Sequence, residues 1–358
     1  MPITKEPNGT YTARFYITDV FGKRKQKKKR GFKTLKEAKQ YEAEQITQKA
    51  CSMSMTFASF YELYMNDIKK RVKESTFENK KNLFEKKLLP YFEKMKVENI
   101  TPVTIRAWQN EMMSRKTKSG ALFSQTYLKT LNNQLTAILN YAVKYYGLEY
   151  NPCNKAGSMG RKHAEEMKIW SIEEFERVAE SAKEKPVTLL ALKLLFWTGM
   201  RIGEMLALTI GDINFSKNII SINKSYQRLK SVDLITEPKT PKSRRQIEVT
   251  STIIEELRNY INSLYCPSEK TRLFPFTKSL FEKDIKTFAT KAGVKIIRIH
   301  DLRHSHASLL LHKGLDIATI SKRLGHENIE TTFKTYAHIY DPNSQRMIEF
   351  LEELHTKK

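Results

Sequence analysis

Two arginines, two histidines and one tyrosine stand in short motifs whose residue types and spacing could hold a phosphodiester and attack it. Arg201 lies in Thr-Gly-Met-Arg-Ile-Gly-Glu, and His300 and Arg303 are three residues apart, as on one turn of a helix. His326 ends a Leu-Gly-His motif, and Tyr336 lies ten residues beyond it. Opening a phosphodiester requires a nucleophile, stabilisation of the non-bridging oxygens and an acid for the leaving oxygen.

The two arginines are candidates for binding a phosphate without a metal ion. A guanidinium matches two phosphate oxygens and keeps its charge, and the sequence has no carboxylate cluster spaced for Mg²⁺. Arg201 is framed by apolar residues on both sides, so its charge needs a partner. A tyrosine, with a pKa of about 10, needs such positive charge and a nearby base to ionise at neutral pH.

The remaining histidines and a second tyrosine leave alternatives open. His300 and His304 are four residues apart, a spacing that could bind zinc from one helix face, but no third ligand is evident and the arginines would repel a cation. His306 and His338 are interpreted as structural histidines. Tyr340, four residues after the first tyrosine, is a rival nucleophile.

Composition indicates a multidomain protein that binds a polyanion. The chain has 358 residues, with 63 Lys and Arg against 39 Asp and Glu, a net charge of +24. Nucleic acid is the favoured partner. A membrane is not expected, because the most apolar run, Val187–Trp197, is too short to span a bilayer. A signal peptide is not expected, because the opening residues are polar, and three scattered cysteines suit a reducing cytoplasm.

The sequence patterns around these residues predict a mainly α protein with small β-sheets (α+β). Its helices and strands are expected to form three domains. Residues 1–50 read as a β-β-β-α unit, with alternating apolar residues from Tyr11 and seven basic residues among the eight of 23–30. Thr34 and Glu37 form a capping box for the following helix. The basic run could be a disordered tail or a strand that lies against DNA phosphates.

Residues 56–150 predict a helical domain with a lysine-rich surface. Aromatic residues from Phe57 to Tyr64 recur at helical spacing and are interpreted as core. A second helix is expected from Ser75 to Pro90, a third after Thr101, and a fourth after Ser124 or Thr126. Residues 153–168 lack periodicity and predict an interdomain linker.

Residues 169–358 predict the third domain. Ser171 and Glu174 form a capping box at its start, and helices are expected over 175–182, 187–197, 201–208, 253–265 and 279–293. Residues 219–225 read as a strand, and residues 234–249 as a hairpin with Pro and Lys at its tip.

Several of these motifs occur in the same order in a known family. The chain resembles the tyrosine recombinases, in particular the integrases of temperate phages and conjugative elements. The resemblance implies a catalytic set of six: Arg201, Lys239, His300, Arg303, His326 and Tyr336. It further implies that Lys239 protonates the leaving 5′-oxygen, that His300 accepts the nucleophile's proton and that His326 contacts the phosphate, the two histidine roles being exchangeable. Tyr336 is preferred over Tyr340 because Thr-Tyr-Ala-His fits the family pattern.

The resemblance also implies function and partners. The expected reaction is cutting and rejoining of DNA at attachment sites through a 3′-phosphotyrosine, without metal, cofactor or ATP, so that a mobile genome integrates and excises. Expected partners are double-stranded DNA at core and arm-type sites, three further copies of the chain, an excisionase and a host DNA-bending protein, in the bacterial cytoplasm at the nucleoid. Residues expected to contact DNA are Arg14, Lys25, Lys27, Lys28, Lys29, Arg30, Thr240, Arg244 and Arg245.

Two other functions remain open on sequence. A type IB topoisomerase would use the same chemistry for relaxation, and a DNA-binding regulator would have lost catalysis. The intact set of six disfavours the regulator. The amphipathic segment Met347–Leu354 is expected to pack on its own domain or on a neighbouring subunit.

Overall fold

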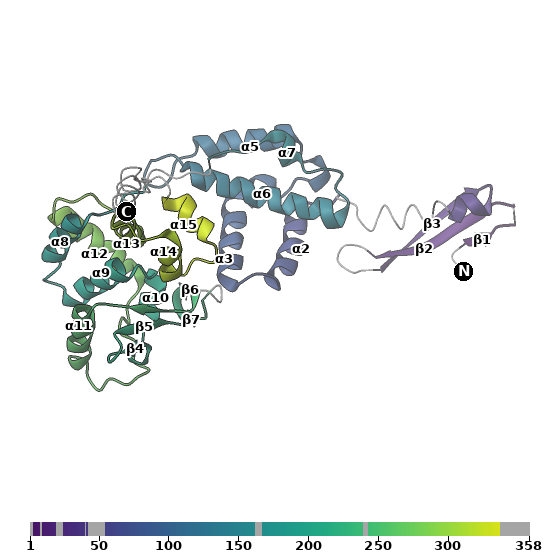
Figure 1. The fold of residues 1–358 in the computed structure, drawn as a ribbon. Helices are drawn as coiled ribbons and strands as arrows, with labels where there is room; N and C mark the ends of the chain where they lie inside the picture. The colour runs from purple at the N-terminus through teal and green to yellow at the C-terminus, as the bar shows by residue number, and fades with distance from the viewer. Residues whose placement is uncertain are drawn as a thin grey trace, which may run out of the picture. The chain divides into compact units, whose positions relative to one another are not determined.

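The computed structural model describes residues 3–7, 9–18, 24–39, 41, 54–161, 167–238 and 243–336, which belong to two compact units, 1–165 and 166–358 (Figure 1). The prediction of a mainly helical chain with small antiparallel sheets is confirmed. In the described part, no helix is both long enough and apolar enough to cross a bilayer.

The N-terminal residues form the predicted β-β-β-α unit. Strands β1 (Ile3–Lys5), β2 (Tyr11–Thr18) and β3 (Arg24–Phe32) make an antiparallel sheet in the order β1-β2-β3, and residues 35–39 are helical. The Thr34 hydroxyl accepts a hydrogen bond from the Glu37 N–H at 3.2 Å, as expected of a helix N-cap. Arg14 pairs in register with Lys28, so exposed basic residues of two neighbouring strands lie side by side.

Residues 54–161 form a helical bundle around an aromatic core. Its helices are α2 (Phe57–Lys69), α3 (Glu74–Leu83), α4 (Leu89–Phe92), α5 (Pro102–Ser114), α6 (Gln125–Tyr146) and α7 (Pro152–Ala156), with a 3₁₀ turn, η2 (Val97–Asn99). The side chains of Thr101 and Ser124 cap α5 and α6 as predicted. Phe57, Phe60 and Tyr64 are buried, which confirms the aromatic stripe as core.

Two expectations for this bundle are corrected. The helix expected from Ser75 to Pro90 is interrupted by a π-helical turn, η1 (Phe84–Leu88), before Pro90, which has no N–H to continue an α-helical ladder. The predicted linker is partly core. Asn151 caps α7, and Cys153 and Met159 are buried against the bundle, 4% and 3% exposed.

In the second unit, helices and two small sheets surround an apolar core. Its elements are α8 (Ile172–Ser181), α9 (Pro186–Thr198), α10 (Ile202–Ala207), η3 (Ile210–Asp212), β4 (Ile213–Asn214), β5 (Ile219–Ile222), β6 (Ser225–Leu229), β7 (Val232–Thr236), β8 (Arg245–Glu248), α11 (Ser251–Asn262), α12 (Lys278–Lys291), α13 (Asp301–His312), α14 (Ile317–Leu324) and α15 (Ile329–Tyr336). Most of α9 is buried, and the capping box of Ser171 is confirmed.

The predicted hairpin over residues 234–249 is wrong. Strand β7 pairs with β6, and β8 pairs with β5, where Ile220 lies opposite Ile247. The two arms therefore belong to different sheets, because the buried Ile247 of β8 packs opposite the buried Ile220 of β5 in the core. Residues 237–244 connect the sheets, and Lys239 and Thr240 lie outside the described residues.

We predict that Met159→Ala destabilises the helical bundle by about 2 to 3 kcal/mol, because a buried methionine leaves a cavity when truncated. Hydrogen exchange of α5 and α6 in increasing urea would measure the loss. Met113, 38% exposed on α5, provides the control, and Met113→Ala should change little. Equal effects of the two substitutions would contradict packing of residues 152–159 on the bundle.

Candidate active site

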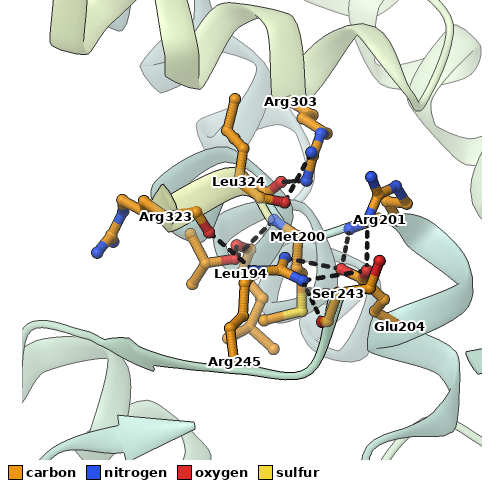
Figure 2. Close-up of polar contacts among 11 residues, drawn as sticks. Leu194, Met200, Arg201, Glu204, Ser243, Arg245, Arg303, Arg323 and Leu324 are labelled. Carbon is orange, nitrogen blue, oxygen red and sulfur yellow. Dashed lines mark hydrogen bonds and ion pairs between the residues drawn. The ribbon is translucent and has the colours of Figure 1, made fainter. Parts of the chain in front are cut away.

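Arg303 is the buried centre of the site. Its side chain extends from the first turn of α13, and the residue is 3% exposed. One Nη donates a hydrogen bond to the carbonyl of Gly199 at 2.8 Å. The other donates to the carbonyl of Leu324, also at 2.8 Å (Figure 2). These carbonyls end α9 and α14, where the helix dipoles are negative. A single guanidinium therefore joins the ends of two helices to a third.

Gly199 allows this junction to form. It ends α9 with φ +66°, a left-handed conformation that favours glycine. A Cβ on Gly199 would lie 2.6 Å from the His306 ring and 2.9 Å from the Leu324 side chain. The chain therefore needs glycine here to turn from α9 into Arg201 while its carbonyl meets Arg303.

Arg201 is held at the edge of the site by Glu204. Arg201 is the N-cap residue of α10; Glu204 accepts hydrogen bonds at 2.8 Å from both its backbone N–H and its guanidinium. Glu204 is 3% exposed and also accepts from Arg245 at 2.9 Å (Figure 2). Burial alone would raise the pKa of Glu204, but hydrogen bonds and charges from Arg245 and Arg201 hold it below its ordinary value.

The prediction that Arg245 contacts DNA does not fit its position. Its side chain is 7% exposed, and it donates to the carbonyl of Arg323 at 2.8 Å and to that of Ser243 at 3.2 Å, besides binding Glu204. Arg245 supports the site from within. Arg244 is exposed and pairs with Glu237 at 2.6 Å.

His300 and His326 lie beside the arginines and are uncharged at neutral pH. His300 immediately precedes α13, and the pKa of its imidazole is lowered to about 4, first by partial burial and then by the charges of His304, Arg303 and Arg201. Burial and Arg303 likewise lower the pKa of His326 to about 4. Nδ1 of His326 lies 2.7 Å from the Thr332 hydroxyl.

Tyr336 is buried at the end of α15. It packs with Ala307, Ile320 and Leu324, and it is 0% exposed. Its hydroxyl lies 2.7 Å from Nδ1 of His304. Burial raises the pKa of Tyr336 to about 12, although the Arg303 charge opposes the rise. The phenol is therefore protonated and out of contact with solvent in this structure.

The structure thus brings five of the six predicted catalytic residues close enough for their charges to interact: Arg201, His300, Arg303, His326 and Tyr336. Lys239 cannot be placed with them. Sequence reasoning considered His304 only as a zinc ligand. No local signal pointed to its contact with Tyr336, which lies 32 residues away in the sequence.

Of the other histidines and the second tyrosine considered in the sequence, the structure describes some and not others. His306 is 2% exposed, and Nε2 accepts a hydrogen bond from Arg323 at 3.1 Å, as suits a structural histidine. His338 and Tyr340 lie outside the described residues, as does Met347–Leu354. Among the residues that the structure describes, no third ligand joins His300 and His304 to form a metal site.

The residues predicted to contact DNA near the N-terminus belong to the other unit. Arg14, Lys28, Lys29 and Arg30 are exposed on β2 and β3. Lys29 lies over the ring of Tyr41, with Nζ 4.2 Å from the ring centroid, so part of its side chain packs locally. Lys25 and Lys27 lie on β3, and their side chains are not described.

Comparisons with known proteins agree with this architecture. Residues 170–342 match the phage integrase family, residues 56–113 a phage integrase N-terminal SAM-like domain, and residues 2–49 an arm DNA-binding domain. The chain is 30% identical to the ICEBs1 integrase of Bacillus subtilis over 85% of this chain and 84% of that protein. It is 26% identical to the integrase of Staphylococcus phage L54a over 65% of this chain and 79% of that protein.

Two solved structures share the fold. The Tn1549 transposon integrase in complex with transposon right end DNA covers 83% of this chain and 100% of its own, with a TM-score of 0.68 and 19% identity. A lambda integrase dimer bound to a core site covers 96% of this chain and 95% of its own, with a TM-score of 0.61 and 16% identity.

The chain therefore belongs to the phage integrase family of tyrosine recombinases, enzymes that cut and rejoin DNA. Within that family it is a site-specific recombinase of the type found in phages and integrative elements.

We predict that the second unit loses stability as pH falls from about 6.5 towards 4. The pKa values of His300 and His326 are lowered to about 4, and burial lowers that of His306 to about 3. The unfolded chain takes up these protons near pH 6.5 and the folded chain does not, so stability present above that pH is lost below it.

Urea unfolding at several pH values would measure this dependence. His306→Gln should make it shallower, because glutamine keeps an acceptor for Arg323 and cannot be protonated. His312, exposed at the end of α13, is the control, and His312→Gln should leave the slope unchanged. Equal slopes in all three proteins would refute the assignment to His306.

Proposed function

We propose that Arg201 and Arg303 bind the scissile phosphate and that Tyr336 attacks it to form a 3′-phosphotyrosine. The observation that carries this proposal is the state of Arg303. Burial, together with the charge of Arg201, lowers the pKa of Arg303 to about 9. The guanidinium is therefore charged at neutral pH, but its surroundings disfavour that charge. The Arg303 guanidinium donates hydrogen bonds to neutral carbonyls, and the nearby carboxylate of Glu204 is shared by Arg201 and Arg245. A bound anion would offset this charge.

In each step of the proposed reaction, one phosphoester bond forms as another breaks, so the number of such bonds does not change. The Tyr336 phenol gives up its proton to a base of the site and its oxygen bonds to phosphorus. The bond from phosphorus to the 5′-oxygen breaks, and Lys239 supplies a proton to that oxygen. Attack by a 5′-hydroxyl reverses these changes and joins a new strand, so no ATP is needed. The resemblance implies that His300 accepts the phenol proton and that His326 contacts the phosphate, where a neutral imidazole can donate a hydrogen bond to an oxygen. The two histidine roles are exchangeable.

The partners follow from the charge and from the relatives. Solved structures include a lambda integrase dimer on a core site and a lambda integrase tetramer on a Holliday junction. We extend these to double-stranded DNA and a synaptic tetramer here, with residues 1–50 on arm-type sites and the domains of 56–150 and 169–358 on core sites. An excisionase, a host DNA-bending protein and action at the bacterial nucleoid complete the proposal.

Tyr336→Phe should bind core-site DNA as the wild type does and form no covalent adduct, because it removes one oxygen and keeps the aromatic packing. Binding relies on many basic contacts across the protein surface. The wild-type adduct should form in excess EDTA, since two arginines supply the stabilising charge. Denaturing gel electrophoresis of labelled DNA measures both results.

Tyr340→Phe is the matched control and should still form the adduct. An adduct retained by Tyr336→Phe and lost in Tyr340→Phe would move the nucleophile. An EDTA-sensitive wild type would show that the arginines do not provide the charge stabilisation alone.

Deletion of residues 1–50 should abolish binding to arm-type DNA and leave core-site cleavage intact. The basis is the exposed pairing of Arg14 with Lys28 on a sheet in which Ala13 is buried, as is Ala38 of the following helix. Electrophoretic mobility shifts on the two DNA classes measure binding. Loss of core cleavage in a folded truncation would contradict the division of labour.

A further inference from the structure

The hydroxyl of Tyr336 contacts a histidine that lies outside the proposed set of six. Nδ1 of His304 is 2.7 Å from this oxygen, and the two ring centroids are 5.7 Å apart. His326 directs its own Nδ1 to Thr332. The resemblance assigns proton transfer to His300, whose ring instead meets the ring of His304 edge-on at 5.3 Å between centroids. Among the described histidines, His304 alone is placed against the reacting oxygen.

The protonation states needed for proton transfer follow from this contact. A protonated phenol donates its hydrogen bond, so Nδ1 of His304 accepts, and the imidazole proton lies on Nε2. Burial lowers the pKa of His304, so the ring is neutral at neutral pH and its Nδ1 lone pair is available. The half-buried ring is also held in place by the rigid first turns of α13.

The charges around His304 oppose proton uptake until an anion is bound. Arg303 and Arg298 disfavour the imidazolium, and the Asp301 carboxylate favours it. His300 and His326, which also interact with His304, are neutral. A phosphate bound at Arg303 would offset one of the opposing charges and strengthen His304 as a base when substrate is present.

We propose that His304 is a catalytic residue that accepts the phenol proton of Tyr336 during strand cleavage, an inference that rests on the proposed function of Tyr336. The O–H bond of Tyr336 breaks and its proton moves to Nδ1 of His304. The oxygen's electron pair forms the bond to phosphorus, and the pair of the broken phosphoester bond leaves on the 5′-oxygen. Religation returns the proton from His304 to Tyr336.

The test is the pH dependence of covalent adduct formation in single turnover on core-site DNA. His304→Asn places an amide oxygen near the position of Nδ1, so it keeps the hydrogen-bond acceptor but cannot take up a proton. We expect adduct formation to slow by about 10²–10⁴-fold, with DNA affinity unchanged. The wild-type rate should fall as His304 becomes protonated at low pH, and this acid limb should be absent in the variant.

Three comparisons make the result decisive. His304→Gln gives a second protein, should the first not fold, and the same loss of the acid limb is expected. His312→Asn, on the exposed end of α13, should match the wild type. His300→Asn should retain the acid limb.

An acid limb retained by His304→Asn or His304→Gln would overturn the proposal, whatever the rate, because a residue that only positions Tyr336 would slow the reaction without removing that limb. Loss of the limb in His300→Asn instead would return the role to His300. Failure of the proposed function would differ from both, since the wild type would then form no adduct through Tyr336.

Discussion

The catalytic unit depends on one buried cation. Arg303 donates to Gly199 at the end of α9 and to Leu324 at the end of α14, and thereby fixes both helices against α13. Gly199 must be glycine for this contact to form, and the turn that it makes delivers Arg201 to the edge of the same site. A guanidinium suits this task because its several N–H donors lie in one plane. A lysine would offer a point charge and could not hold both carbonyls in the same geometry.

The same cation determines the electrostatics of its neighbours. Burial and positive charge keep His300 and His326 neutral. Glu204 stays ionised despite its burial, because Arg245 and Arg201 stabilise the carboxylate. In the free protein the Tyr336 phenol is therefore a very weak acid and the surrounding imidazoles are weak bases. An anion bound at Arg303 would strengthen the imidazoles as bases, since it would offset the charge that opposes imidazolium formation.

Much of the fold could be predicted from local signals. Helix caps such as Ser171 and Thr101 depend on a few adjacent residues. Helices with one apolar face are recognisable because their apolar residues recur at helical spacing. Pairing of β8 with β5 could not be predicted, because register depends on which buried faces meet in the core. For the site, motif order led to the arginines and Tyr336. The burial of Arg245 and the contact of His304 depend on residues distant in sequence, and no local pattern encodes them.

Helix α15 contacts the rest of its unit through two buried residues whose hydroxyls hydrogen-bond to histidines. Only Thr332 and Tyr336 of its eight residues are buried, and each hydroxyl meets the Nδ1 of an imidazole, His326 and His304 respectively. A neutral Nδ1 can accept from a hydroxyl, whereas a protonated one can only donate. The position of the helix that carries Tyr336 is therefore coupled to the charge on the His304 and His326 rings.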